Sequence, residues 1–124
     1  MEKDLKELLL KDLCARLPYG VKCCVYDRIG TLCEYSNYGV GVDYEDGEDT
    51  TCRIEYCKPY LFPLSSMTSE QKKEYAKLLA YSSNVNIIQI TGESTYDWLN
   101  RNMFDWRGLI PRGLALDATR LNIY

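Results

Sequence analysis

The stretch VGVDYEDGEDTTC, residues 40–52, decides the fold, because segments rich in β-branched and aromatic residues lie on both sides of an Asp46-Gly47 pair. Such segments are typical of strands. Asp-Gly is the strongest hairpin signal in the chain, because a type I′ turn needs positive φ at both of its central positions. We therefore expect an antiparallel hairpin with strands over 40–45 and 50–56.

Two similar segments precede this hairpin, VKCCVY (21–26) and TLCEY (31–35). The sequences DRIG and SNYG, which separate the segments, contain the residues that favour turns. Short strands joined in this way predict an antiparallel β meander of about four to five strands.

Helical patterns lie on either side of the meander. Leucines at i, i+3 and i+4 predict a helix over 3–17, which Pro18 and Gly20 end. We expect the charged residues on the remaining side of this helix to form its solvated face.

Two more helices are marked by their first residues. Thr68 and Gln71 form a capping box that opens a helix over 69–81, and Ser94 caps another helix. NIIQI (86–90) is expected to be a short buried strand.

The segment KPYLFPLSS (58–66) is expected to be a connector, because Pro59 and Pro63 disfavour a regular element. We expect its residues 60–62 to tuck onto the core, although an exposed contact patch is the alternative. Together the elements predict the α+β class, with a meander packed against about three helices in a single domain over 1–124.

Composition narrows the function. The chain has 124 residues, 15 Lys and Arg against 18 Asp and Glu, a net charge of −3, and no histidine. An acidic chain lacks the usual electrostatic footprint of nucleic-acid binding. The absence of histidine removes the side chain most often used for acid–base chemistry near neutral pH. We expect no cofactor.

No apolar run approaches the roughly 18 residues of a membrane span, and no signal-peptide pattern occurs. We therefore expect a cytoplasmic protein.

Six cysteines invite a metal or disulfide interpretation, at Cys14, Cys23, Cys24, Cys33, Cys52 and Cys57. No Cys-x-x-Cys spacing occurs, and that spacing is the usual first half of a structural zinc site. We expect reduced cysteines that act as small core residues, with zinc and disulfides as the alternatives. Cys23 and Cys24 should point to opposite faces of their strand.

Acidic residues crowd the predicted turn, at Asp43, Glu45, Asp46, Glu48 and Asp49. Their spacing does not match the alternating ligand positions of an EF-hand. We expect a solvated, charged hairpin tip.

The segment DWLNRNMFDWRGLI (97–110) contains Asp-Trp twice. On one helix, eight residues at about 100° each would rotate the second pair by roughly 80° from the first, so the tryptophans would not stack. Trp98 suits the core face, whereas Arg107 and Gly108 suit the last turn and the exit of this helix. The tail 113–116 is expected to add a strand, and Trp106 is either in the core or outside for a partner.

Aromatic and arginine side chains are enriched at protein interfaces and on platforms for single-stranded nucleic acid. They gather in this segment and in the connector. The candidate binding residues are Tyr60, Phe62, Tyr96, Arg101, Trp106 and Arg107.

Three blocks, KDLCARLPYGVK (11–22), KPYLFPLSSMT (58–68) and DWLNRNMFDWRGLIPRGLAL (97–116), resemble an uncharacterised family of short proteins from anaerobic gut bacteria and their phages. The resemblance implies a phage or mobile-element origin and brings no activity with it. In that family a His-His pair often stands where this chain has Asn102 and Met103, and a tyrosine where it has Trp106. This chain therefore lacks the imidazole groups that a metal or proton-transfer role at those two positions would need.

We expect a non-enzymatic interaction or accessory protein that binds an unknown protein partner and no membrane. The alternative is a small nucleic-acid-binding protein that uses the aromatic C-terminal segment and the arginines Arg101, Arg107, Arg112 and Arg120.

An enzyme is a third possibility. It would use the Cys23 thiol beside Lys22, or the carboxylates of Asp97 and Asp105. Two carboxylates eight residues apart on one helix are about 12 Å apart along its axis, which is too far for paired-acid catalysis.

Overall fold

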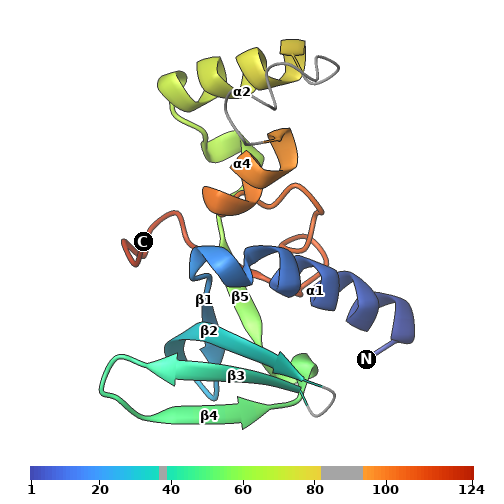
Figure 1. The fold of residues 1–124 in the computed structure, drawn as a ribbon, viewed down its shortest axis with the longest axis vertical. Coiled ribbons are helices and arrows are strands. Elements are labelled where there is room, and N and C mark those ends of the chain that lie inside the picture. The colour runs from blue at the N-terminus through green and yellow to red at the C-terminus, as the bar shows by residue number, and fades with distance from the viewer. Residues whose placement is uncertain (37–38, 82–93) are drawn as a thin grey trace.

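The computed structural model describes residues 1–36, 39–81 and 94–124, so the strand expected over 86–90 lies outside the described residues. The described residues form three α-helices and a six-stranded sheet, and they confirm the α+β class (Figure 1). The helices are α1 (Lys3–Arg16), α2 (Ser69–Tyr81), α4 (Thr95–Arg101) and the 3-10 helices η1 (Leu17–Tyr19), η2 (Ile54–Tyr56) and η3 (Leu64–Ser66). The strands are β1 (Lys22–Val25), β2 (Arg28–Ser36), β3 (Gly39–Tyr44), β4 (Asp49–Cys52), β5 (Lys58–Leu61) and β6 (Leu116–Asp117).

The strand order across the sheet is β4-β3-β2-β1-β5-β6. The strands β1 to β4 form the expected antiparallel meander. Strand β5 returns to the free side of β1 and pairs with it antiparallel, and β6 then pairs parallel to β5. The sheet is therefore mixed and one strand larger than predicted.

The extra strand overturns part of one prediction, because the first half of 58–66 is not a connector. Strand β5 includes Pro59, which faces Cys23 of β1. Proline is tolerated near the start of a strand, and the parallel partner β6 pairs only from Tyr60 onward, beyond the proline. The expected tucking onto the core is confirmed for Tyr60 and Leu61, whose side chains are buried, while Phe62 is half-buried.

The turn type predicted at Asp46-Gly47 is wrong, and a type I′ turn occurs instead between β1 and β2. In the β3–β4 hairpin only Gly47 has positive φ, at 91°, and its N–H donates to the carbonyl oxygen of Tyr44. This is a type I turn followed by a glycine bulge, not the predicted type I′ turn. Between β1 and β2, Tyr26 and Asp27 have φ of 51° and 62°, as a type I′ turn requires. Strand β2 therefore begins at Arg28, earlier than expected.

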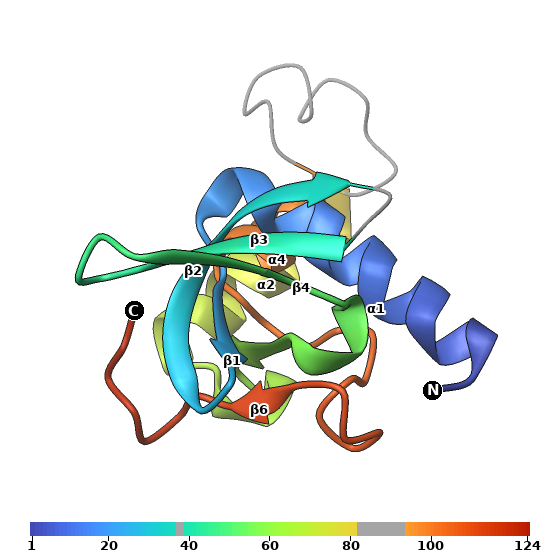
Figure 2. The ribbon, with the colours of Figure 1, turned by 90° about the horizontal axis from the view of Figure 1, so that it is seen from below.

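Helix α1 packs on the inner face of the meander (Figure 2). Its Leu9 and Leu13 are buried with Cys23 and Val25 of β1 and Val42 of β3 in the main hydrophobic cluster. The leucine spacing thus predicted the correct face. The charged residues of α1 are not all solvated, because Asp12 and Arg16 are fully buried, as described below.

Helices α2 and α4 build a second, smaller hydrophobic cluster around Trp98 and Phe104. Figure 1 shows these helices at one end of the molecule and the meander at the other, with α1 between them. Both predicted helix starts are confirmed: Thr68 with Gln71 and Ser94 with Asp97 form reciprocal capping bonds.

The helix predicted to run through both Asp-Trp pairs is shorter than expected. Helix α4 ends at Arg101, and Met103 has a φ of 61°. The chain then pairs with Phe62, whose N–H donates to the Met103 carbonyl oxygen at 2.8 Å and whose carbonyl oxygen accepts from the Asp105 N–H at 2.8 Å. This long-range pairing overrides the helical pattern, and Gly108 lies outside the helix, just before a turn over 109–113. The tail 113–116, which was expected to add a strand, is a turn and bend as far as Ala115, and the two-residue strand β6 begins only at Leu116.

All six cysteines are free in the structure. Cys23 points inward and Cys24 outward, as predicted from strand geometry. Only Cys23, Cys52 and Cys57 are buried, so the expectation of core cysteines holds for half of the six. No helix in the described ranges has the length and apolar character needed to cross a membrane.

Candidate functional site

The six predicted binding residues do not form one surface. Tyr60 is only 7% exposed and belongs to the sheet, and Phe62 packs between the two hydrophobic clusters. Arg101 is exposed at the end of α4. The remaining three, Tyr96, Trp106 and Arg107, do meet, and we call them the aromatic stack.

In the aromatic stack the ring centroids of Tyr96 and Trp106 are 4.6 Å apart, and the guanidinium of Arg107 lies 4.0 Å from the centroid of the Trp106 ring. Tyr96 is 58% exposed, whereas Trp106 and Arg107 are half-buried. Trp106 is therefore neither a core residue nor a fully exposed one. The tryptophan of the other Asp-Trp pair, Trp98, is buried and donates its Nε1 hydrogen to Glu74 of α2.

Buried polar groups hold the aromatic stack in place. The Nε1 of Trp106 donates to the Oδ1 of Asn100 at 2.9 Å, and Asn100 is only 5% exposed. The Nη1 of Arg107 donates to the Oδ1 of Asp12 at 2.8 Å. A side chain that is fixed before binding loses less conformational entropy when it meets a partner.

Asp12 also forms a fully buried ion pair with Arg16, one turn further along α1. The Nε of Arg16 lies 3.0 Å from the Oδ2 of Asp12, and the Nη2 of Arg16 donates to the Phe104 carbonyl oxygen at 2.6 Å. Two guanidinium groups thus share one carboxylate. The Nη1 of Arg16 is buried without a hydrogen-bond partner among the described residues.

This network joins segments that are far apart in sequence. Asp12 and Arg16 belong to the block 11–22, and Phe104 and Arg107 belong to the block 97–116. The third block meets them through the pairing of Phe62 with Phe104. The three blocks quoted for the family resemblance therefore converge at the junction between the two hydrophobic clusters.

The sequence contained a signal for this network that the prediction missed. Asp12 and Arg16 follow Leu9 at i+3 and i+7, so they lie on the apolar face of α1 and not on its charged side. Asn100 carried no such signal, because its burial depends on where the chain turns after α4.

The thiol and the two carboxylates considered for catalysis either form hydrogen bonds to the backbone or lie where the pKa is shifted in the wrong direction for a nucleophile. The pKa of the Cys23 thiol is raised, mainly by a hydrogen bond with Cys57 and to a smaller extent by burial. A nucleophilic cysteine needs a lowered pKa. The side chain of Lys22 leaves the opposite face of β1. Asp97 caps α4, and Asp105 accepts the backbone N–H groups of Leu109 and Ile110.

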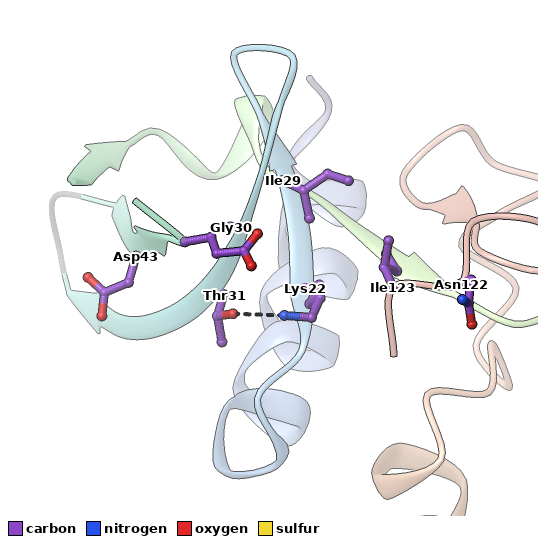
Figure 3. Close-up of a pocket in the computed structure, with 8 residues that line it drawn as sticks. Lys22, Ile29, Gly30, Thr31, Asp43, Asn122 and Ile123 are labelled. Carbon is purple, nitrogen blue, oxygen red and sulfur yellow. Dashed lines mark hydrogen bonds between the residues drawn. The ribbon is translucent and has the colours of Figure 1, made fainter. Parts of the chain in front are cut away.

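A separate pocket of about 410 Å³ lies on the outer face of the meander (Figure 3). Strands β1, β2 and β3 form its floor, and Asn122 and Ile123 form one wall. Lys22 points toward Thr31, with 3.4 Å between its Nζ and the Thr31 Oγ1. The size is within the range of sites that bind small molecules.

The C-terminal wall of this pocket is attached through Tyr124. The Tyr124 hydroxyl accepts a hydrogen bond from the Lys22 N–H at 2.9 Å and donates to the Tyr60 carbonyl oxygen at 2.7 Å. Its ring also lies against Phe62, with 5.7 Å between ring centroids. The sequence could not predict this pocket, because the bond that holds its C-terminal wall in place joins Lys22 to Tyr124, 102 residues apart along the chain.

The fold and these sites describe a small α+β protein that presents an anchored aromatic stack and a mixed-charge pocket. No family model, curated protein or solved structure matches the chain. Within the described residues no group of three or more histidine, cysteine, aspartate or glutamate side chains is placed to hold a metal ion.

Proposed function

We propose that the protein is a non-catalytic accessory protein that binds a protein partner through the aromatic stack of Tyr96, Trp106 and Arg107. Tryptophan, tyrosine and arginine are the side chains that most often dominate the energy of protein interfaces. The observation that carries the proposal is the anchoring of a half-exposed tryptophan and arginine by the buried residues Asn100 and Asp12. The resemblance noted above leads us to propose a phage or mobile-element origin and a cytoplasmic location.

A protein partner is favoured over nucleic acid by the charge around the stack. The guanidinium of Arg107 is already paired with the Asp12 carboxylate, and the whole chain has a net charge of −3. Affinity for nucleic acid depends mainly on the number of phosphates that free cations neutralise. A nucleic acid would therefore find little uncompensated positive charge at the stack.

The proposal is tested by affinity purification from the organism that encodes the chain, followed by mass spectrometry. Wild-type protein is compared with Tyr96→Ala and with the control Tyr56→Ala. The control removes a tyrosine of matched exposure, 56% against 58%, which also stacks on a neighbouring ring. We expect a partner that wild type and Tyr56→Ala retain and that Tyr96→Ala loses.

Two results would contradict the proposal. One is a partner that all three proteins retain equally, and the other is no specific partner at all. If nuclease treatment releases whatever the wild type captures, the nucleic-acid alternative replaces the protein partner.

A further inference from the structure

The pocket on the outer face of the meander contains opposite charges that do not neutralise each other. The strand registers place Lys22 of β1 opposite Thr31 of β2, and Thr31 opposite Asp43 of β3. Because β1 and β3 are two strand spacings apart, roughly 10 Å, the Lys22 ammonium and the Asp43 carboxylate lie at opposite ends of this row. Among the residues that the structure describes, Lys22 forms no ion pair with either acid of the pocket, Asp43 or Glu45.

The neighbouring arginine, Arg28, is already paired with two carboxylates outside the pocket. Arg28, at the start of β2, pairs with Asp46 at 2.8 Å and with Glu48 at 2.9 Å. Arg28 therefore does not neutralise Asp43 or Glu45, and among the described residues the Asp43 carboxylate has only the thiol of Cys33 as a side-chain hydrogen-bond partner.

Part of the pocket lining is apolar. Ile29 of β2 is 43% exposed, which is high for an isoleucine on a sheet face, and it lines the pocket with Ile123. An aliphatic group placed between these two side chains would remove apolar surface from water. The pocket thus offers a cation, two carboxylates and an apolar contact within one space of about 410 Å³.

We propose that this pocket binds a small zwitterion, an α-amino acid with an aliphatic side chain. The ligand carboxylate accepts hydrogen bonds from the Lys22 ammonium and the Thr31 hydroxyl. Its ammonium donates to the carboxylates of Asp43 and Glu45, and its side chain lies on Ile29 and Ile123. This site is separate from the aromatic stack, so either proposal can fail without the other.

The experiment uses leucine and two analogues that each lack one charge. The ¹⁵N-labelled protein is titrated with L-leucine, with 3-methylbutylamine, which has no carboxylate, and with 4-methylpentanoate, which has no ammonium. We expect leucine to shift the amide resonances of Thr31 and Ile123, and each analogue to bind at least about tenfold more weakly, because charged hydrogen bonds are lost.

Matched variants assign the two ends of the ligand. Lys22→Met should weaken leucine binding about tenfold and leave the binding of the amine unchanged, whereas Glu45→Gln should weaken both. Lys73→Met and Glu70→Gln on α2, both exposed and outside the pocket, should bind leucine as wild type does. Thr31→Val provides a second variant at the carboxylate end if Lys22→Met fails to fold.

The proposal is overturned if about 10 mM leucine, far above the Kd of ordinary ligand sites, shifts no pocket resonance. It is also overturned if the amine alone binds as well as leucine, because the pocket would then respond only to positive charge. Loss of leucine binding in the α2 controls would equally contradict the assignment to this pocket.

Discussion

Asp12 is the residue on which the junction of the two hydrophobic clusters depends. Its carboxylate accepts hydrogen bonds from Arg16 and Arg107, and both side chains of the Asp12–Arg16 pair are fully buried. Replacing the carboxylate would leave a buried guanidinium without its counter-charge. We expect Asp12→Ala to lower the free energy of unfolding by about 3–5 kcal/mol, measured by urea denaturation.

The control for this prediction is an ion pair at the surface. Lys6 and Glu55 lie 3.1 Å apart with partly exposed side chains, so water already screens their attraction. Glu55→Gln should change the urea midpoint far less than Asp12→Ala does. Equal effects of the two substitutions would mean that burial adds nothing to the Asp12 network.

Gly39, at the start of β3, is a second sensitive residue. It has a φ of 138°, and an added Cβ would overlap the carbonyl oxygen of Cys52 on the neighbouring strand. Gly39→Ala should therefore lower the free energy of unfolding by about 2 kcal/mol or more. Gly113→Ala, where φ is 74° but the space around the added Cβ is open, should lower it by only about 1 kcal/mol. Thermal unfolding of both variants distinguishes a steric overlap from backbone strain alone.

The β1–β2 hairpin is the element whose turn fits its sequence least well. Tyr26 and Asp27 both have positive φ, a conformation that favours glycine and asparagine. We expect Asp27→Gly to raise the free energy of unfolding by about 0.5–1 kcal/mol, because relief of the left-handed backbone strain outweighs the greater entropy of glycine in the unfolded chain. The denaturant midpoint of the variant measures this gain.

The β3–β4 hairpin supplies the matched comparison. The φ of Asp46 is not positive, so its backbone is not strained in this way. Its side chain pairs with Arg28 and accepts a hydrogen bond from the Glu48 N–H. Asp46→Gly should therefore lower the midpoint. An increase in both variants would show that the effect does not come from turn geometry.

The elements with local signals were the ones that the sequence could predict. The capping boxes at Thr68 and Ser94 and the leucine face of α1 involve residues three or four positions apart, and all three are confirmed. The meander was also predictable, because its strands pair with their neighbours in the chain. The turn types were not, since Asp46-Gly47 is compatible with more than one hairpin geometry.

Elements that depend on distant contacts escaped prediction. Strand β5 exists because β1 and β6 pair with it, and the helix expected beyond Arg101 is replaced by pairing with Phe62. The candidate site shows the same division. Tyr96, Trp106 and Arg107 were predicted from composition, whereas their anchors Asp12 and Asn100 required the tertiary arrangement.

At the scale of the whole molecule, tyrosine and cysteine side chains whose pKa values are raised by burial make the folded state less stable at alkaline pH. Burial raises the pKa of Tyr60 to about 12 and the pKa of Cys52 to about 11. The folded protein therefore keeps these protons at a pH where the unfolded chain loses them. Their contribution to stability is complete below about pH 8.5–10, the ordinary range of thiol and phenol pKa values, and is lost as the pH rises toward the folded values.

We accordingly expect the free energy of unfolding, measured in reducing buffer, to be constant from pH 7 to 8 and to fall between about pH 9 and 12. Tyr60→Phe removes one of the titrating groups and should make this fall shallower. Tyr35→Phe, at an exposed position on β2, should leave the slope unchanged. A stability that does not vary up to pH 11 would contradict the coupling.

The bond between Arg107 and Asp12 also bears on the order in which the chain folds. It joins residues 95 positions apart, whereas the β1–β4 meander is assembled from neighbouring hairpins. Closing a long loop costs more chain entropy than closing a short one, and contacts distant in sequence slow folding. The hairpins should therefore form early, and the 97–116 segment should dock onto α1 late, after the rate-limiting step. In kinetic terms, substitutions in the Asp12 network would mainly accelerate unfolding and leave the folding rate almost unchanged.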